Sequence, residues 1–182
     1  MLLNKESCVL IFNVFSCLCL TGCSFSAQMS TTAIPVVQNI DIEKYLGTWY
    51  EIARLPNSFE RNLDQVTATY TWREDGKIKV LNRGFNTEKN IWKEATGKAW
   101  IPDPDVPSRL RVSFFLFFAS DYRIIALDDE NYSYAMVTSN SMKYLWVLSR
   151  DPQMDTEVYD RLTKQAQAYG FDIEKLYRVT HS

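Results

Sequence analysis

The chain reads VTATYTWREDGKIKVLNRGF over residues 66–85, two runs of alternating side chains separated by a short polar segment. Ala68 and Tyr70 share one face of the first run, and Val80 lies on the matching face of the second. This alternation predicts β-strands, because successive side chains of a strand point to opposite faces. Residues 74–77, EDGK, have the composition of a tight turn. The stretch therefore predicts an antiparallel hairpin.

The same alternation recurs along the chain at a fairly even spacing. We expect eight strands, over residues 48–54, 66–72, 78–85, 92–101, 109–115, 122–128, 134–138 and 144–149. Most connections are short, so consecutive strands should pair as antiparallel neighbours. Eight strands that close on themselves form an all-β barrel whose interior is wide enough for one small ligand.

After the eighth strand the period changes. Apolar side chains then recur at steps of three and four residues, which predicts one amphipathic helix carrying Val158, Leu162, Ala166 and Tyr169 on its apolar face. Asp155 is a suitable N-cap and Gly170 a suitable stop. Residues 176–179 alternate again and should return to the edge of the sheet. The helix should lie against the outside of the barrel.

Side-chain parity decides which face of the barrel is apolar. One face carries Ala68, Tyr70, Ile78, Val80, Val112, Phe114, Tyr122, Ile124 and Trp146, and the other carries Thr69, Thr71, Lys79, Arg83, Arg111, Ser113 and Arg123. A Lys or Arg that faced lipid at mid-depth would cost about 2–4 kcal/mol. Leu81 and Phe115 also interrupt the charged face, which therefore makes a poor polar lumen. We expect a water-soluble barrel with an apolar interior and charges that face water.

The longest connection joins the first two strands. Residues 55–63 include Pro56, Asn57 and Phe59 and should form a mobile flap at one end of the barrel. Because strand direction alternates, residues 117–120 should lie at the same end. There Leu116, Phe117 and Phe118 could line the mouth, touch a membrane or fold back over the core.

The N-terminal region has the pattern of an export signal. Residues 9–20 are apolar over a length that suits a signal peptide better than a membrane-spanning helix. The run LTGC at residues 20–23 resembles the lipobox of bacterial lipoproteins, which implies cleavage before Cys23 and acylation of its thiol. An ordinary signal peptide with an incidental cysteine is the alternative. We expect a lipoprotein signal peptide at residues 1–22, a lipidated tether at 23–36 and the folded domain at 37–182.

Cysteine usage and charge narrow the class of protein further. All four cysteines lie in the first 23 residues, so the mature domain would have no disulfide and must rely on its core. Ser24 follows Cys23, and in the lipoproteins that the chain resembles, a residue other than aspartate there favours delivery to the outer membrane, facing the periplasm. The net charge is −2 with mixed signs, so no basic face indicates nucleic-acid binding.

Two distant segments carry a resemblance to the lipocalins. Residues 47–51, GTWYE, match the G-x-W-Y signature of that family, and residues 148–150, LSR, match the end of its third motif. The resemblance covers residues 42–179 and is greatest to the bacterial outer-membrane lipocalins, relatives of apolipoprotein D. It implies an up-and-down barrel of eight antiparallel strands with a C-terminal helix packed outside.

The resemblance also implies structural roles for four residues. Gly47 would let the first strand bend, Trp49 would plug the barrel floor, and the guanidinium of Arg150 would lie over the indole ring. The second family motif, T-D-Y, is altered here to LDD at residues 127–129, so only Asp128 matches it. Asp128 would help to tie the closed end.

The apolar interior predicts an elongated apolar ligand. The expected ligand-binding residues are Ala68, Tyr70, Val80, Asn82, Val112, Phe114, Tyr122, Ile124 and Trp146. Asn82 would hydrogen-bond either a headgroup or a neighbouring tyrosine. The resemblance implies fatty acids or lysophospholipids as ligands, bound for storage or transport in the cell envelope, and leaves open whether two barrels pair as a homodimer.

Two other functions remain open on the sequence alone. A barrel filled by its own side chains would serve as a structural or protective lipoprotein. A lipid-processing enzyme would need an acid–base group such as Glu51, which has inward parity in the first strand. Catalysis has little support, because His181 is the only histidine and no phosphate loop, nucleophile elbow or metal-spaced His or Cys set is present. We expect no catalytic residue, no metal and no cofactor.

Overall fold

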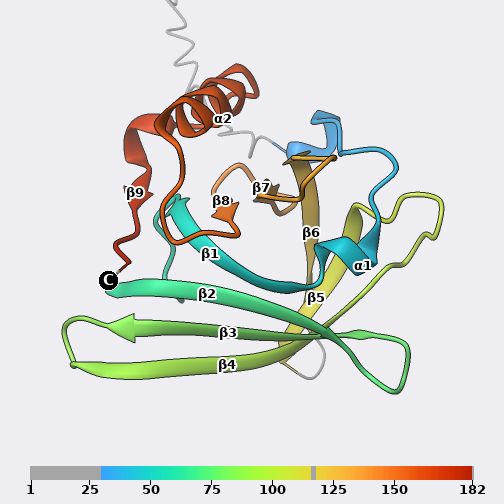
Figure 1. Ribbon diagram of the computed structural model, residues 1–182, viewed down its shortest axis with the longest axis horizontal. Coiled ribbons are helices and arrows are strands. Elements are labelled where there is room, and N and C mark those ends of the chain that lie inside the picture. The colour runs from blue at the N-terminus through green and yellow to red at the C-terminus, as the bar shows by residue number, and fades with distance from the viewer. Residues whose placement is uncertain (1–29, 116–117, 182) are drawn as a thin grey trace, which may run out of the picture.

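The structure, a computed structural model, describes residues 30–115 and 118–181, and within these residues nine strands form one antiparallel sheet (Figure 1). The strands are β1 (Gly47–Arg54), β2 (Leu63–Trp72), β3 (Ile78–Asn86), β4 (Ile91–Trp100), β5 (Arg109–Phe115), β6 (Phe118–Leu127), β7 (Tyr134–Thr138), β8 (Leu145–Ser149) and β9 (Tyr177–Arg178). Their order is β2-β3-β4-β5-β6-β7-β8-β1-β9, and β1 also pairs with β2. That pairing closes the sheet, so the predicted barrel of eight consecutively paired strands is confirmed.

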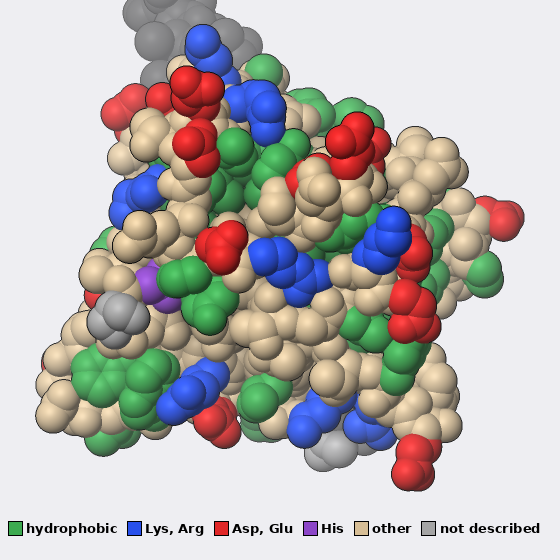
Figure 2. All heavy atoms as spheres, in the orientation of Figure 1, with side chains coloured by type: hydrophobic (Ala, Val, Ile, Leu, Met, Phe, Trp, Pro, Cys, Tyr) green, Lys and Arg blue, Asp and Glu red, His purple; other side chains and the backbone are tan. Residues whose placement is uncertain are grey.

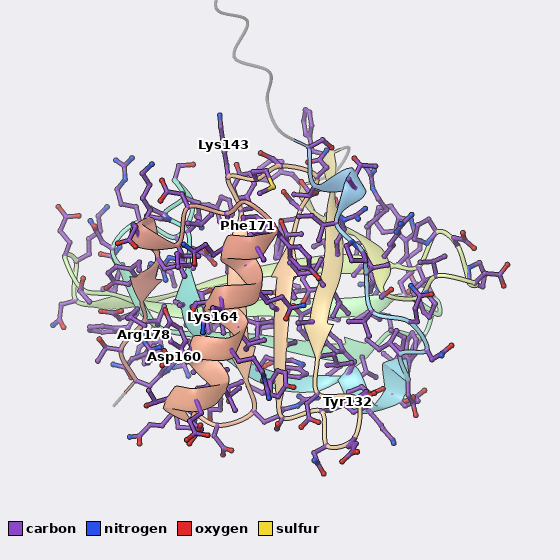
Figure 3. All side chains as sticks on the ribbon, turned by 90° about the horizontal axis from the view of Figure 1, so that it is seen from above. Tyr132, Lys143, Asp160, Lys164, Phe171 and Arg178 are labelled. Carbon is purple, nitrogen blue, oxygen red and sulfur yellow. The ribbon has the colours of Figure 1, made fainter. Side chains whose placement is uncertain are left out.

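One helix covers part of the outside of this barrel, as the sequence predicts. In α2 (Thr156–Ala168), the Asp155 side chain accepts hydrogen bonds from the first-turn amides, and Gly170 follows with a φ of 90°. Figure 3 shows α2 lying across the strands, with Phe171 where the chain leaves the helix and Arg178 beside it. Arg178 belongs to β9, which pairs with β1 as expected of the returning segment. None of the described helices is long and apolar enough to cross a membrane.

Two apolar clusters lie on opposite sides of the barrel wall. The outer cluster lies between the wall and α2, and it includes Ile34, Ile52, Ala53, Val147, Leu162 and Ala166. The inner cluster lies inside the barrel, and its members or packed neighbours include Tyr45, Trp49, Ala68, Tyr70, Ile78, Val80, Val112, Tyr122, Ile124 and Trp146. Eight of the nine residues assigned to the interior by parity therefore lie in or against the inner cluster. The ninth, Phe114, is 41% exposed.

Two residues of the predicted water-facing set are buried, so that expectation is wrong for them. Arg123 is 6% exposed, and its Nη2 donates to the carbonyl of Ile34. The N-terminal segment covers this stretch of β6, as the hydrogen bond from the Val37 amide to the Ile124 carbonyl shows. Ser113 is also buried and donates to the carbonyl of Phe115. Elsewhere acidic and basic side chains are interspersed over the surface (Figure 2).

The N-terminal end of the described chain is packed. Thr31, Ile34 and Val36 are buried, although they lie within the segment expected to be the tether. The remaining expectations for the N-terminus, the signal peptide at residues 1–22 and the lipidation of Cys23, lie outside the described residues. Leu116 and Phe117 also lie outside them.

Three short helices were not predicted. They are η1 (Thr31–Ala33), α1 (Ile42–Tyr45) and η2 (Ile173–Lys175). Each spans about one turn, which is too short for an apolar period to identify. α1 has a consequence for the barrel, because it places Tyr45 in the inner cluster, where the Tyr45 ring packs 5.0 Å from that of Trp49.

Candidate functional site

The closed end of the barrel is built around Trp49. Its side chain is fully buried and its Nε1 donates to the carbonyl of Tyr45 at 2.8 Å. The guanidinium carbon of Arg150 lies 3.8 Å from the centre of the indole ring. Gly47 has a φ of 96°, and a Cβ there would lie 3.2 Å from Nη1 of Arg150. The structure thus gives these three residues the positions that the family resemblance implied.

Asp128 stabilises the loop between β6 and β7 at the same end. Its carboxylate accepts hydrogen bonds from the Asn131 amide and from the amide and hydroxyl of Ser133. Burial raises the pKa of Asp128, but these hydrogen bonds lower it more, and the net shift is downward. The carbonyl of Ser133 in turn accepts from the Arg150 amide. In Figure 3 the adjoining Tyr132 lies beside α1, and its hydroxyl accepts from the Asp41 amide.

A chain of three tyrosine hydroxyls lies in the inner cluster. The hydroxyl of Tyr122 is 2.6 Å from that of Tyr45 and 2.9 Å from that of Tyr70. Burial raises the pKa of Tyr70 to about 12 and shifts those of the other two upward. The three phenols are therefore neutral at ordinary pH and satisfy one another inside the barrel, in keeping with the rule that buried polar groups are hydrogen-bonded.

A β-bulge in β1 brings a second charged side chain into the barrel. Glu51 lies opposite Leu148 and Arg54 opposite Trp146, with one irregular step between them at Ile52. Simple alternation from Trp49 would place Arg54 on the outside. The extra residue changes its parity. Glu51 and Arg54 are both 4% exposed, and Arg54 Nη1 donates to Glu51 Oε1 at 2.6 Å.

Arg54 also binds the flap, residues 55–63. Its Nη2 donates to the carbonyls of Glu60 and Leu63, each at 2.9 Å. Glu60 is 7% exposed, and its carboxylate accepts hydrogen bonds from Trp146 Nε1 at 3.0 Å and from Asn57 Nδ2. The flap could be identified from the sequence, but this cluster could not. Arg54 has an unexpected parity in β1, and Glu60 lies in a loop that has no periodic pattern.

Aromatic rings extend the attachment of the flap to the rim of the barrel. The Phe59 ring centre lies 5.9 Å from that of Tyr144 and 6.3 Å from that of Trp146. Phe59 is nevertheless 61% exposed. The expected mobile flap is therefore fastened by hydrogen bonds at Glu60 and Leu63 and by ring contacts at Phe59.

The inner wall of the barrel becomes exposed away from the Trp49 end. On β4, Ala99 is fully buried, whereas Ala95, which lies on the same face, is exposed. On β5, Leu110 is 4% exposed and Phe114, again on the same face, is 41% exposed. The pairing of β4 with β5 is limited to Lys98, Ala99 and Trp100 of β4. The apolar interior therefore meets solvent at the end where the flap lies.

For Asn82 the sequence left two hydrogen-bond partners open, a ligand headgroup or a neighbouring tyrosine. It has inward parity on β3, between Ala68 on β2 and Ala95 on β4. Its Oδ1 is buried and accepts no hydrogen bond from any residue in the described ranges. No tyrosine in those ranges satisfies this oxygen, so a donor from a ligand or a water molecule would fit it.

A groove of about 400 Å³ that the sequence did not indicate lies on the outside of the barrel. Its lining is Thr48, Tyr50, Gln65, Thr67, Thr69, Leu81, Arg83, Trp92, Pro152 and His181. Thr48 pairs with Thr69, and both point away from the inner cluster that contains Trp49 and Ala68. The groove is therefore separate from the interior.

Comparison with known protein families supports the assignment made from the motifs. The family model described as a lipocalin-like domain matches residues 40–181 of the sequence. Outer membrane lipoprotein Blc of Vibrio cholerae is 43% identical over 169 residues, covering 93% of this chain and 96% of that protein. Blc of Escherichia coli K12 is 44% identical over 154 residues, covering 85% and 86%. Mouse apolipoprotein D is 35% identical over 150 residues, covering 78% and 77%.

Solved structures show the same fold at lower sequence identity. Insecticyanin of the tobacco hornworm Manduca sexta has a TM-score of 0.66 and 20% identity, covering 82% of this chain and 85% of its own. The cockroach allergen Per a 4 has a TM-score of 0.64 and 22% identity, covering 82% and 94%.

Proposed function

Because the chain belongs to the lipocalin family, we propose that it binds an elongated apolar molecule in its barrel and stores or transports that molecule in the cell envelope. Fatty acids and lysophospholipids are the proposed ligands. The acyl chain would lie along the inner wall, and the headgroup would remain near the rim that bears the flap.

The observation that carries this proposal is the change in exposure along the inner wall. The wall is closed at Trp49 and apolar through Ala99 and Leu110, and it reaches solvent at Ala95 and Phe114. Each chain methylene buried there contributes about 0.8 kcal/mol. A long acyl chain gains several kcal/mol even after its ordering cost, which is sufficient for retention in the micromolar range.

The residues proposed to contact the ligand are those of the predicted inner face. Ala68, Tyr70, Val80, Val112, Tyr122, Ile124 and Trp146 lie in or against the inner cluster. Phe114 lies where the wall becomes exposed, and Asn82 offers a buried acceptor without a partner among the described residues. The hydroxyls of Tyr70 and Tyr122 are hydrogen-bonded to each other, so the rings rather than the hydroxyls would contact the acyl chain.

We propose the outer membrane, on its periplasmic face, as the location, with an acyl anchor on Cys23. Two observations support this. The run LTGC at residues 20–23 fits a lipobox, and the relatives from Vibrio cholerae and Escherichia coli are named outer membrane lipoproteins. Thr31 is buried against the barrel, and the length of chain between it and Cys23 would separate the barrel from the membrane surface.

Mass spectrometry of lipids that co-purify from native membranes tests the proposed ligand. We expect an acyl-chain lipid near one molecule per barrel, or per pair of barrels if the protein is a homodimer. A Val112→Glu variant should retain much less of it. Lipid at trace levels, or equal amounts on both proteins, would instead favour a barrel that is filled by its own side chains.

Enzymatic activity has a separate test. Glu51, the acid–base candidate, is engaged by Arg54 at 2.6 Å and lies near Glu60. A lipid-processing enzyme would turn over a lysophospholipid and lose that activity on Glu51→Gln. We expect the bound lipid to be recovered unchanged from both proteins.

A further inference from the structure

We propose that Glu51, Glu60 and Arg54 form a proton-controlled latch that holds the flap closed over the rim of the barrel. One proton between the two carboxyl groups keeps the flap closed, and loss of that proton opens it. The latch itself is independent of the proposed function. Its effect on ligand uptake rests on that function.

The geometry of the cluster makes it a fastening for the flap. Arg54 is fixed in β1, and its Nη2 binds two flap carbonyls, those of Glu60 and Leu63. Glu60 accepts a hydrogen bond from Trp146 on β8, the strand beside β1, in which Trp146 is the cross-strand partner of Arg54. The flap is thereby joined to β1 and β8 through the inward-pointing side chains of Arg54 and Trp146. It cannot lift unless these contacts break together.

The number of charges in the cluster makes the fastening sensitive to a proton. Two carboxyl groups face one guanidinium, and all three side chains are less than one-tenth exposed. Arg54 contacts Glu51 at 2.6 Å, whereas its Nε is 4.0 Å from Glu60. If both carboxyl groups are ionised, the cluster has one uncompensated negative charge in a poorly solvated interior, which is costly.

The other polar groups around the cluster do not supply the missing positive charge. Tyr70 of β2 faces the carboxylates as a neutral phenol, and the Tyr177 ring of β9 lies 4.7 Å from the Arg54 guanidinium. The Tyr177 hydroxyl donates to the carboxylate of Asp64, so the nearby charged group on this side is also acidic. His181 contacts the backbone carbonyl of Glu51 through Nε2 at 2.8 Å.

The titration of Glu51 follows from this environment. Burial raises the pKa of Glu51 well above its ordinary value, and the charge of Glu60 raises it further, with Arg54 opposing both. Glu51 therefore retains a proton in the closed state at a pH where an exposed glutamate has lost it. A flap that opens would hydrate Glu51 and lower its pKa. Rising pH thus favours the open state, and falling pH favours the closed one.

Linkage gives the size of the effect. When one proton is released on opening, the closed-to-open ratio falls by up to about tenfold for each pH unit, between the ordinary pKa of glutamate and that of the closed state. Glu51→Gln keeps an oxygen acceptor for Arg54 and a hydrogen-bond donor for Glu60 without titrating. This variant should hold the flap closed at every pH.

Hydrogen–deuterium exchange on the purified protein tests the latch without any ligand. Exchange is followed on peptides that cover residues 55–63, from roughly pH 5 to pH 9, and corrected for the intrinsic pH dependence of exchange. The protection factor of the wild-type flap should fall with rising pH, whereas that of Glu51→Gln should stay flat. In Glu60→Gln the fall should span a narrower pH range, because burial still raises the pKa of Glu51 but the charge of Glu60 is gone. Glu74→Gln, in the exposed turn after β2, should behave as the wild type.

The outcomes separate the latch from its alternatives. A wild-type protection factor that does not change with pH would overturn the proposal. A slope that persists in Glu51→Gln would also overturn it, because another group such as His181 would then be responsible. If Glu51→Gln does not fold, Glu60→Gln still decides, because a fall in protection over the same pH range as in the wild type would contradict the coupling of the two carboxyl groups.

The association rate of a zwitterionic lysophosphatidylcholine tests whether the latch controls the mouth, because that probe does not titrate over this range. The rate should rise with pH in the wild type and not in Glu51→Gln. A rate that is independent of pH while flap protection falls would refute control of uptake and leave the flap latch intact. Failure of the probe to bind at any pH would count against the proposed function, and the exchange data would still test the latch.

Discussion

Arg150, which directly follows the last strand of the barrel, lies over the indole ring of Trp49 in the first strand. Its guanidinium carbon is 3.8 Å from the ring centre. The same guanidinium donates to the carbonyls of Lys44, Leu46 and Thr48 at 2.7–2.9 Å. One side chain thus joins β8 to α1 and to the start of β1. The closed end is held by this contact, and the proposed ligand would enter from the other end.

Arg150→Ala should therefore destabilise the fold and leave ligand affinity nearly unchanged. The cation–π contact contributes about 0.5–2 kcal/mol, and hydrogen bonds from a charged donor contribute about 1.5–3 kcal/mol. Because these contacts are partly replaced by water in the variant, we expect a loss of about 3 kcal/mol in the free energy of unfolding, measured with urea. Arg161→Ala, which removes an exposed cation 5.2 Å from the Tyr134 ring, should cost less than about 1 kcal/mol. Equal losses would contradict the role of Arg150.

A second prediction concerns the two faces of β5. Val112→Glu places a charge against the inner cluster, so it should weaken the binding of a fluorescent fatty acid by at least about tenfold. Arg111→Glu changes the neighbouring residue, which points outward and pairs with Asp121 at 2.8 Å, and it should leave the dissociation constant within about threefold. Equal effects of the two substitutions in a binding titration would reverse the assignment of the faces.

The pKa of Asp128 leads to a pH-dependent prediction. Because hydrogen bonds hold this pKa below its ordinary value in the folded state, the ionised group stabilises the fold above the unfolded pKa of about 3.9. That contribution is lost as the pH falls through the folded pKa. Asp128→Ala should therefore lower the free energy of unfolding by about 1–2 kcal/mol at neutral pH and by less in acid. Asp129→Ala, at an exposed neighbour, is the control, and urea unfolding at two pH values is the measurement.

The membrane anchor is tested by changing its proposed attachment site. Cys23→Ser should release the protein from the membrane fraction while the purified domain keeps its affinity for the fatty acid. Cys19→Ser, within the expected signal peptide, should leave the protein in that fraction. Membrane association of the Cys23→Ser variant would show that another feature holds the protein there.

The strands and their order follow from the sequence because alternation and turn composition are local signals. Hairpins such as residues 66–85 have both signals, and the structure agrees with each of them to within a few residues at the ends. The eight apolar residues placed in or against the inner cluster follow from the same parity. The closed end could be predicted from the residues at positions 47–51 and 148–150.

The features that could not be predicted from the sequence depend on an irregular step in a strand and on contacts between segments that are distant in the chain. The bulge at Ile52 changes the parity of Arg54, and only the pair of apolar residues Ile52 and Ala53 hints at it. Arg123 looks like a solvent-facing charge until the N-terminal segment is seen to cover it. The partner of Glu51 in the flap depends on how residues 55–63 fold back, which has no periodic signal.

Titration of the delipidated protein with a fluorescent fatty acid measures lipid binding inside the barrel. We predict saturation at one ligand per barrel, or one per pair of barrels, with Val112→Glu strongly impaired. No uptake by the wild-type protein, or uptake that is unchanged by Val112→Glu, would contradict a lipid-binding interior.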